Sequence, residues 1–437
     1  MYNNCEKKSH EVIIVLKEIT IKNFKSINDE VTFSMEADYE RVSEMDDHII
    51  NVNNNKLLKV ASMYGPNGGG KSNILSAIQM IKNLVINNNV RVNYDKRKIT
   101  CEFCNNDVIS MTFFFVTDKY EIGYKFDVKY KITHQDAFDY SGNKYSYNIA
   151  SLEVEYEALN YKTTDMNEFI LLFERDNKGN IRSESLDKLN IKYSKIININ
   201  LAALNYLYGT FVNIRNINSV ELDVILNLYQ EIYNIYDLEV TSVNYNVAFN
   251  AIAANKDRLI KLLNDVDIKI NDIILNKNDK TSPIRFERIV NVNGNIEKRS
   301  IPLYEESKGT IKIFWMFVNL LNENLRSHIF ICDDMNAYLH PKLYKAIIEI
   351  FNSKDNSDKQ LIFNSHDIIN MTNELFRRDE IWFVYRDDNY STKLIPLSNI
   401  VNYKGEQVRK DAKYYKQYLE GRYGADPFIK KGLNWYE

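Results

Sequence analysis

The residues whose types and spacing most clearly suggest chemistry form the stretch Gly65-Pro66-Asn67-Gly68-Gly69-Gly70-Lys71-Ser72. An apolar run at residues 57–64 precedes it and indicates a buried strand, and apolar residues at helical spacing follow it. A G-x-x-x-x-G-K-S pattern between a strand and a helix is typical of a phosphate-binding loop, because glycines let backbone N–H groups surround an anion. In such a loop Lys71 would neutralise phosphate charge and the Ser72 hydroxyl would ligate Mg²⁺. The sequence therefore predicts a site for a nucleoside triphosphate, and a plain glycine-rich turn is the alternative.

Two later strands end in side chains that suit the same chemistry. Asp333 and Asp334 follow the apolar run at residues 329–332, and His366 follows a second apolar run. A carboxylate at the end of such a strand helps to hold Mg²⁺, usually through water, so Asp333 is expected to join Ser72 at the metal. Asp334 is placed to orient or deprotonate an attacking water, and His366 to hydrogen-bond a γ-phosphate. A simple turn at the aspartates and a structural histidine are the alternative interpretations.

Two further stretches are candidates for completing this site. Ser307-Lys308-Gly309 stands at the entrance of a predicted helix, where it would cap the helix and offer hydrogen-bond donors to an anion. Lys25 lies in a short turn, Asn23-Phe24-Lys25-Ser26, between two predicted strands that precede the glycine-rich loop. From this turn its ammonium group would approach the phosphates. A simple helix cap and a solvated turn lysine are the respective alternatives.

Length and composition indicate an ordered protein with no overall attraction to nucleic acid or membranes. The chain has 437 residues, of which 45% are hydrophobic and 26% charged, and its formal net charge is −3. One large domain with a lobe, or two domains, is expected at this length. No apolar run reaches membrane-spanning length and the four cysteines suit a reducing cytosol, so we expect a cytoplasmic protein without membrane contact. Cys101 and Cys104 form a lone C-x-x-C, which favours two ordinary thiols over zinc, because zinc prefers four ligands.

The order of the predicted elements indicates a mixed α/β fold with added lobes. Short β-branched and aromatic runs between residues 109 and 175 predict an antiparallel block, and apolar residues at helical spacing between 198 and 270 predict several helices. An Asn-Gly pair within residues 284–301 predicts a hairpin. No heptad pattern is sustained over many turns, so a long coiled coil is not expected. The expected parts are residues 1–197 with the antiparallel lobe, residues 198–283 as a helical lobe, and residues 284–437 with the later motifs.

The order of these motifs resembles the ABC-type ATPase heads of the SMC, RecF and OLD group. It is more closely similar to the compact bacterial AAA-15-type ATPases of phage-defence operons, the RloA/AbiL/PARIS-ATPase kind. The resemblance covers nearly the whole chain and extends to Asn73 and to residues 21–26, 339–341, 377–384 and 421–428. The tail motifs are more specific than the glycine-rich loop, which many unrelated NTPases share. The implied fold is an ABC-type (RecF/SMC-head-like) P-loop ATPase with an antiparallel β lobe, an inserted helical lobe and no long coiled coil.

The resemblance also implies a head that binds ATP and Mg²⁺ and dimerises on ATP. Asp334 departs from the glutamate that is usual in the family, and its shorter side chain predicts slow hydrolysis and a long-lived ATP state. The implied catalytic residues are Lys71, Asp334 and His366, and the implied metal ligands are Ser72 and Asp333. The implied nucleotide-binding residues are Lys25, Gly65, Pro66, Asn67, Gly68, Gly69, Gly70, Lys71, Ser72 and Asn73, completed by Ser307 and Gly309 of the other subunit.

Because this family is found in phage-defence operons, typically beside an effector gene, our first hypothesis is a sensor or regulator in abortive infection that controls a separately encoded effector. The resemblance therefore implies an RloB-like or Toprim nuclease as partner, and a phage protein or DNA as trigger. Only 71 residues follow His366 (437 − 366), which is too few for an appended Toprim domain. Two alternatives stay open: a RecF-like ATPase of DNA repair, and a scaffold that binds ATP without useful turnover. DNA-stimulated turnover would favour the first, and a function that needs Lys71 but not Asp334 would favour the second.

Overall fold

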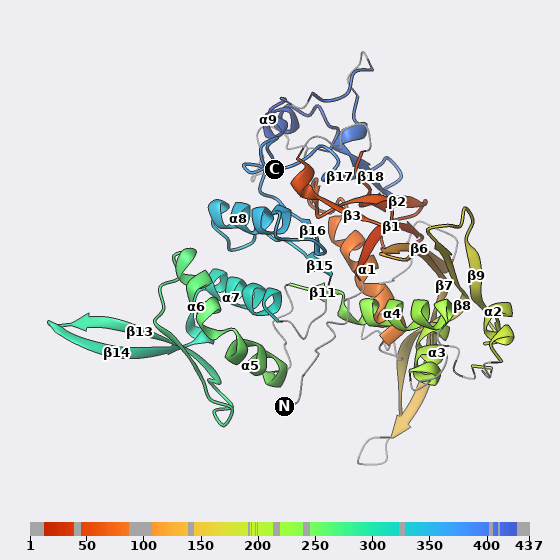
Figure 1. The fold of residues 1–437 in the computed structure, drawn as a ribbon, viewed down its shortest axis with the longest axis horizontal. Helices are drawn as coiled ribbons and strands as arrows, with labels where there is room; N and C mark the ends of the chain where they lie inside the picture. Colours follow the sequence, from red (N-terminus) through yellow and green to blue (C-terminus); the bar gives the residue numbers. More distant parts are fainter. Residues whose placement is uncertain are drawn as a thin grey trace, which may run out of the picture.

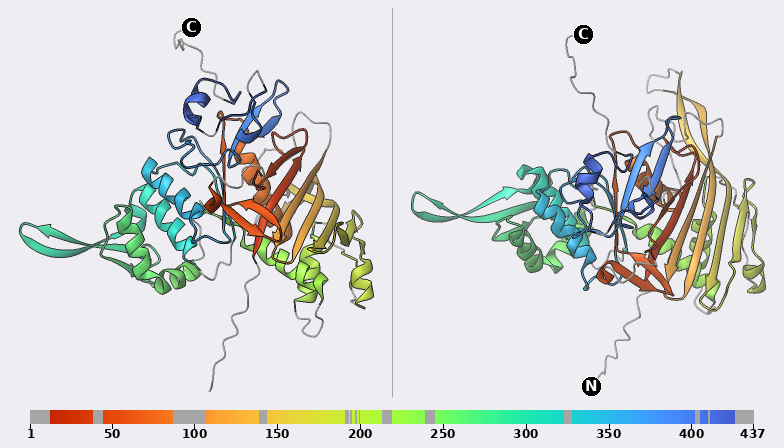
Figure 2. Two further views of the ribbon diagram at one scale, coloured as in Figure 1. Left: turned by 45° about the horizontal axis from the view of Figure 1, so that its top comes forward. Right: turned by 90° about the horizontal axis from the view of Figure 1, so that it is seen from above.

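The computed structural model describes residues 13–38, 45–86, 107–138, 144–190, 193, 195–196, 198, 200–212, 219–238, 245–322, 328–401, 405–409 and 411–425. Two β-sheets form the body of the molecule with helix α1 (Lys71–Ile86) packed between them, and further helices surround this body (Figures 1 and 2). A long hairpin extends away from the body (Figure 1).

The first sheet carries the candidate site at one of its edges. Its strand order is β11-β15-β16-β5-β17-β18, and all neighbouring strands run parallel except β17 and β18, which are antiparallel to each other. Since the carboxyl ends of parallel strands meet at the same edge, the residues that follow β5, β15 and β16 lie close together. The strands are β5 (Val60–Tyr64), β11 (Tyr236–Asp237), β15 (Ile329–Cys332), β16 (Gln360–Asn364), β17 (Ile381–Arg386) and β18 (Thr392–Pro396).

The second sheet is antiparallel throughout, which confirms the prediction for this part of the chain. Its strand order is β10-β9-β8-β7-β6-β1-β2. The first strand changes register between Leu16 and Glu18. The strands are β1 (Ile14–Lys22), β2 (Val31–Ser34), β6 (Val108–Thr117), β7 (Tyr120–Phe138), β8 (Lys144–Thr163), β9 (Ile170–Asp176) and β10 (Ile181–Arg182).

Successive side chains of the central strands point to opposite faces of the parallel sheet, and both faces are covered. In β15, Ile329 and Ile331 belong to the hydrophobic cluster with α1 and the antiparallel sheet. Phe330 and Cys332 point to the opposite face, where they pack with α8 (Pro341–Asn352). A parallel strand that is buried on both faces appears in sequence as a continuous apolar run, which is the pattern found here.

The helices divide between separate hydrophobic clusters. Helices α3 and α4 share a cluster with α1, whereas α5 and α6 pack with α7 in a different one. The helical segment therefore packs in two places, and the division of the chain at residues 197 and 283 stays a prediction. The helices other than α1 and α8 are α2 (Glu184–Lys188), α3 (Ala203–Phe211), α4 (Val220–Asn234), α5 (Tyr245–Ala254), α6 (Lys256–Asp265), α7 (Lys308–Leu320) and α9 (Tyr414–Leu419).

The projecting hairpin consists of β13 (Ile284–Val292) and β14 (Asn295–Pro302), and the short β12 (Asp272–Leu275) pairs with its base (Figure 1). Asn293 and Gly294 at its tip have φ values of 52° and 88°. Two consecutive positive φ values are what a two-residue Asn-Gly turn requires. The predicted hairpin is thus confirmed.

The apolar run at residues 57–64 is divided between two strands, so its prediction as one strand is wrong. Its first two residues end β4 (Asn55–Leu58), which pairs with β3 (Ile49–Val52) in a separate two-stranded sheet, and β5 begins at Val60. The break falls at Lys59, whose buried ammonium group donates to the Ser353 carbonyl oxygen at 2.8 Å. The strands on either side of Lys59 pair with different partners, β4 with β3 and β5 with β16 and β17.

Other expectations concern long or apolar segments. In the described ranges the longest helix is α1, with 16 residues, which agrees with the expected lack of a long coiled coil. Among the described residues, no helix is both long and apolar enough to cross a membrane. Cys101 and Cys104 lie outside the described residues.

One buried side chain joins the two sheets. Gln360, at the start of β16, accepts a hydrogen bond from the Leu16 N–H at 2.7 Å and donates to the Leu16 carbonyl at 2.9 Å. It also donates to the Leu58 carbonyl at 3.2 Å. The side-chain amide thus pairs with the backbone of β1 as a neighbouring strand would, and it satisfies groups that have no access to water.

A buried histidine ties α4 to the start of β15. His328 Nδ1 lies 2.8 Å from Glu231 Oε2, and its Nε2 lies 3.6 Å from Asp358 Oδ2. Burial by itself lowers the pKa of His328, and the charge of Lys359 lowers it further. The hydrogen bond and charge of Glu231, together with Asp358, outweigh both effects and raise the pKa above its usual range.

This histidine should make stability depend on pH in a defined direction. Because the pKa is raised by folding, its contribution is complete below the usual histidine pKa of about 6.5 and is lost as the pH rises through the raised value. We expect His328→Gln to reduce the free energy of unfolding more at about pH 5.5 than at about pH 9. Urea unfolding of both proteins at the two pH values measures this difference, and an equal loss at both would contradict the assignment.

Candidate nucleotide-binding site

The glycine-rich loop joins β5 to α1 at the carboxyl edge of the parallel sheet. The backbone has φ values of 150°, 75° and 110° at Gly65, Gly68 and Gly70, a region that glycine enters without strain. Lys71 and Ser72 are the first residues of α1, so the unpaired N–H groups of the helix start lie at the loop. This is the local structure that the sequence predicts.

One side of the loop is packed against the protein and another is open. A Cβ added at Gly65 would lie 2.0 Å from the Val384 carbonyl oxygen of β17. A Cβ added at Gly70 would lie 2.2 Å from Thr392 Oγ1, so glycine is required at both positions. A Cβ at Gly68 would meet nothing within 4 Å. Backbone N–H groups around such an open side form a nest that fits a phosphate.

Lys71 carries a poorly solvated charge at the base of the loop. Lys71 is 6% exposed, and its ammonium group donates to the carbonyl oxygens of Gly65 at 2.9 Å and Pro66 at 3.1 Å. Burial lowers the pKa of Lys71, although the charges of Asp334 and Asp333 act in the opposite direction. A charge held in this way gains strongly from an anion placed next to it.

Ser72 and Asp333 meet at the sheet edge although they are 261 positions apart. Ser72 Oγ donates to Asp333 Oδ1 at 2.9 Å. A hydroxyl and a carboxylate are oxygen ligands of the kind that Mg²⁺ prefers, usually together with water and substrate phosphates. The pair therefore fits a Mg²⁺ ion that is bound with a nucleotide.

Asp334 and His366 lie next to each other, also at this edge. His366 Nε2 is 3.9 Å from Asp334 Oδ1, and the side chains are 45% and 55% exposed respectively, so a ligand has access to both. Burial lowers the pKa of His366 and the charge of Lys71 lowers it further, against the opposing charges of Asp334 and Asp333. The neutral imidazole is thereby favoured, which offers one hydrogen-bond donor and one acceptor.

The backbone of Asp334 gives a physical reason for aspartate at this position. Its φ is 42°, in the left-handed region where aspartate and asparagine are enriched over longer side chains. The Asp334 N–H donates to Asn364 Oδ1 at 2.6 Å, and Lys312 Nζ of α7 donates to the Asp334 carbonyl at 3.0 Å. A glutamate here would gain reach but would strain this conformation.

Asn364, the last residue of β16, has a central place in the site that the sequence analysis did not assign. Its side-chain amide donates to Asp333 Oδ1 and, at 3.5 Å, to Ser72 Oγ, while its oxygen accepts from Asp334 N–H. It is fully buried and so fixes the two aspartates relative to each other. The feature of the sequence that points to this role is a polar residue at the end of an apolar strand.

The turn that contains Lys25 packs directly against the glycine-rich loop. Asn73 Nδ2 donates to Ser26 Oγ at 2.5 Å, so the Asn73 side chain contacts this turn. Lys25 has a φ of 51°, and its ammonium group lies 5.4 Å from the centroid of the Phe24 ring. The turn is thus held at the start of α1, with the Lys25 charge near the Phe24 ring, and the approach of Lys25 to the phosphates stays a prediction.

Ser307 and Gly309 stand at the start of α7, which lies apart from α1 (Figure 1). Ser307 Oγ accepts a hydrogen bond from the Thr310 N–H at 3.1 Å, so it caps the helix. A Cβ added at Gly309 would lie 2.4 Å from the Tyr338 carbonyl oxygen, in the loop that follows Asp334. The start of α7 therefore packs on the loop that follows Asp334.

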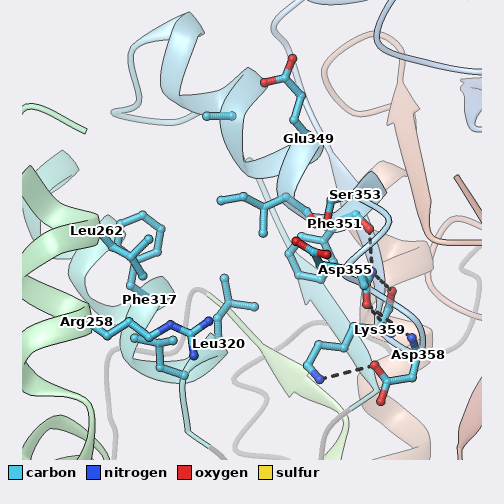
Figure 3. A pocket seen from close by; sticks show the side chains of 14 residues that line it. Arg258, Leu262, Phe317, Leu320, Glu349, Phe351, Ser353, Asp355, Asp358 and Lys359 are labelled. Atoms are coloured by element: carbon cyan, nitrogen blue, oxygen red, sulfur yellow. Dashed lines mark hydrogen bonds and ion pairs between the residues drawn. The ribbon is translucent and has the colours of Figure 1, made fainter. Parts of the chain in front are cut away.

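A cavity of about 670 Å³ lies elsewhere, between α6, α7, α8 and the loop that follows α8 (Figure 3). Apolar side chains such as Leu262, Phe317 and Phe351 line it together with charged ones, among them Arg258 and Asp358. None of the residues placed in the candidate site lines this cavity. It is therefore separate from the candidate site.

Comparison with known proteins gives one family and a set of distant structures. The model of the family described as "AAA domain, putative AbiEii toxin, Type IV TA system" matches residues 60–370, more than half of the chain. The SMC head domain from Thermotoga maritima is 13% identical with a TM-score of 0.37, covering 87% of this chain and 98% of that one. No curated protein matches the sequence.

Two further solved structures are similar at the same level. An SmcHead bound to the C-winged helix domain of ScpA is 13% identical with a TM-score of 0.39, covering 87% of this chain and 96% of that one. An Smc head domain with an extended coiled coil, bound to the C-terminal domain of ScpA derived from Pyrococcus furiosus, is 12% identical with a TM-score of 0.37. The match covers 88% of this chain and 96% of that one. At these values the likeness says nothing about substrate or partner.

Proposed function

The chain belongs to the AAA-domain family named for the AbiEii toxin of type IV toxin–antitoxin systems, and we propose that it is an ATP-hydrolysing regulator in an anti-phage abortive-infection system. Its fold is that of an ABC-type P-loop ATPase. One observation carries the ATPase part of the proposal: Ser72 of the loop contacts Asp333 at the sheet edge where Asp334 and His366 also lie. The motif order and the family's link to toxin–antitoxin systems support the regulatory part.

In the proposed reaction each residue of the edge has a distinct task. Ser72 and Asp333 would hold Mg²⁺, which would supply positive charge to the phosphates. Lys71 exchanges the loop carbonyls for a phosphate oxygen and neutralises its charge. Asp334 orients a water and accepts its proton, and His366 in its neutral form donates a hydrogen bond to the γ-phosphate.

The proposed active unit is a dimer that forms on ATP. Ser307 and Gly309 of one copy would complete the site over the glycine-rich loop of the other, since in their own chain they stand at the start of a different helix. The hydrogen bond from Lys312 of α7 to the Asp334 carbonyl supports this arrangement, because it connects the part that would contact the second copy to the hydrolytic residue.

The proposed partner is a separately encoded effector, such as an RloB-like or Toprim nuclease, with a phage protein or DNA as the trigger. Pull-down of the product of the adjacent gene by this chain, with and without Mg-ATP, tests the proposal, and light scattering of the same samples reports the dimer. We expect association to depend on ATP in the wild type and to be insensitive to ATP in Lys71→Met. No association in either state, together with ATP turnover stimulated by double-stranded DNA, would contradict the defence role and favour a RecF-like function.

The aspartate at position 334 leads to a prediction about rate. We expect Asp334→Glu to raise turnover about tenfold, because a misplacement of about 1 Å can cost about 100-fold. The same change should lower the melting temperature, because glutamate is less suited to a φ of 42°. Steady-state phosphate release and thermal unfolding measure the two effects. Unchanged or reduced turnover in a folded variant would show that the shorter carboxylate does not limit hydrolysis.

A further inference from the structure

Three segments that are distant in sequence meet behind the glycine-rich loop. They are the turn after β1, the start of α1, and the start of β18, and Figures 1 and 2 show β1 and β2 beside β17 and β18. Ser26, Asn73 and Thr392 contribute one side chain each. Thr392 is fully buried and Ser26 is 8% exposed, so their hydroxyl groups depend on protein partners.

The direction of the hydrogen bonds among these side chains follows from counting protons. Thr392 Oγ1 donates to the Gly69 carbonyl oxygen at 3.0 Å, which uses its only proton. In the 2.7 Å contact between Ser26 Oγ and Thr392 Oγ1, Ser26 must therefore be the donor. Ser26 Oγ in turn accepts from Asn73 Nδ2 at 2.5 Å. The result is a chain of donors from Asn73 through Ser26 and Thr392 to the loop carbonyl, in which each bond strengthens the next.

This chain orients a peptide group of the glycine-rich loop. In a trans peptide the C=O and the following N–H point in opposite directions. Because Thr392 holds the Gly69 carbonyl behind the loop, the Gly70 N–H is turned to the other side, where a phosphate nest requires a donor. Gly70 itself has a φ of 110° and no room for a Cβ beside Thr392, so the peptide and the threonine are closely fitted.

We propose that Thr392, supported by Ser26 and Asn73, is a positioning residue for the nucleotide, which sets the affinity for ATP by holding the Gly69–Gly70 peptide. This rests on the proposed nucleotide binding. The Thr392 N–H also donates to the Ser26 carbonyl at 2.8 Å, so Thr392 holds the turn that carries Lys25 as well as the glycine-rich loop. A shift of β18 would then reach the loop and Lys25 together.

Calorimetric titration of the full chain with Mg-ATP tests the proposal. Thr392→Val keeps the shape of the side chain and removes the hydroxyl, and we expect it to weaken ATP binding about tenfold. Thr392→Ser restores the donor, so its affinity should lie within about twofold of the wild type. Thr117→Val is the matched control, because Thr117 is also fully buried with its hydroxyl bonded to backbone groups, at the turn between β6 and β7. It should leave the affinity unchanged.

The outcomes separate this inference from the proposed function. A wild-type protein that does not bind Mg-ATP overturns the proposed function and this inference together. A wild type that binds, with Thr392→Val and Thr392→Ser both at wild-type affinity, overturns the inference alone. If Thr392→Val does not fold, Ser26→Ala breaks the same chain one bond earlier, and wild-type affinity in that variant also overturns the inference. If Thr117→Val weakened ATP binding as much as Thr392→Val, the loss would reflect general stability, and this result would also overturn the inference.

Discussion

Asp334→Asn is expected to lower ATP turnover about 100-fold or more, while ATP affinity changes by less than about threefold. Asparagine has nearly the same shape and accepts a φ of 42°, so the loop after β15 is expected to keep its conformation. The change removes the carboxylate charge 3.9 Å from His366 Nε2 and with it the proton acceptor for water. Such general-base catalysis contributes about 10²–10⁴-fold to a rate. Single-turnover hydrolysis and calorimetric titration measure the two quantities separately.

Asp118→Asn is a suitable control for this variant, because Asp118 is an exposed residue in the turn between β6 and β7. It should hydrolyse ATP at the wild-type rate. A rate for Asp334→Asn within about threefold of the wild type would mean that another group activates the water. If wild type and variant both bind ATP and neither hydrolyses it, the chain is a nucleotide-bound scaffold.

Lys71→Met is expected to weaken ATP binding about 10- to 100-fold without lowering the melting temperature of the nucleotide-free protein. A hydrogen bond to a charged group contributes about 1.5–3 kcal/mol, which sets the size of the binding loss. Stability should respond differently because burial lowers the pKa of Lys71. A base whose pKa is lowered by folding carries its full penalty at pH values below that lowered pKa, and methionine removes this penalty at neutral pH. Calorimetry and thermal unfolding without nucleotide measure the two effects.

Lys82→Met is the matched control on the same helix. Lys82 is also a lysine whose pKa is lowered by burial, and its Nζ donates to the Ile235 carbonyl at 2.8 Å, outside the candidate site. We expect it to bind ATP like the wild type. Equal loss of ATP binding in both variants would mean that α1 tolerates no change of this kind, and wild-type binding by Lys71→Met would remove Lys71 from the site.

The parts of the site that the sequence predicts well are those set by one strand, one turn and one helix. The glycine-rich loop is such a unit, and the apolar run before Asp333 marks a strand of the same sheet. Once both strands are parallel and in one sheet, their carboxyl ends lie at the same edge, with only β16 between them, and Ser72 reaches Asp333 there. The spacing of apolar residues in each run likewise predicts whether it forms a strand or a helix, and the order of these elements predicts the general fold.

Other parts of the site depend on contacts that no local pattern records. Thr392 is an ordinary residue at the start of a β-strand, and its partner Gly69 is 323 positions away. The positive φ of Asp334 is a property of the folded backbone, so the sequence shows the shorter carboxylate but not the conformation that suits it. The prediction of one strand at residues 57–64 is wrong for a related reason. Apolar character alone does not distinguish one strand from two strands that join different sheets.

The pairing of Gln360 with Leu16 has a consequence for hydrogen exchange. Strand β1 changes register just after Leu16, and amides at such irregular places usually exchange quickly through local opening. Here the Leu16 N–H is held by the Gln360 side chain at 2.7 Å, and that side chain belongs to the other sheet. This amide is therefore expected to be released when the Gln360 side chain leaves it, as it would when the two sheets move apart. Its exchange with deuterium should be slow, and its rate would report how often the body of the molecule opens between its two sheets.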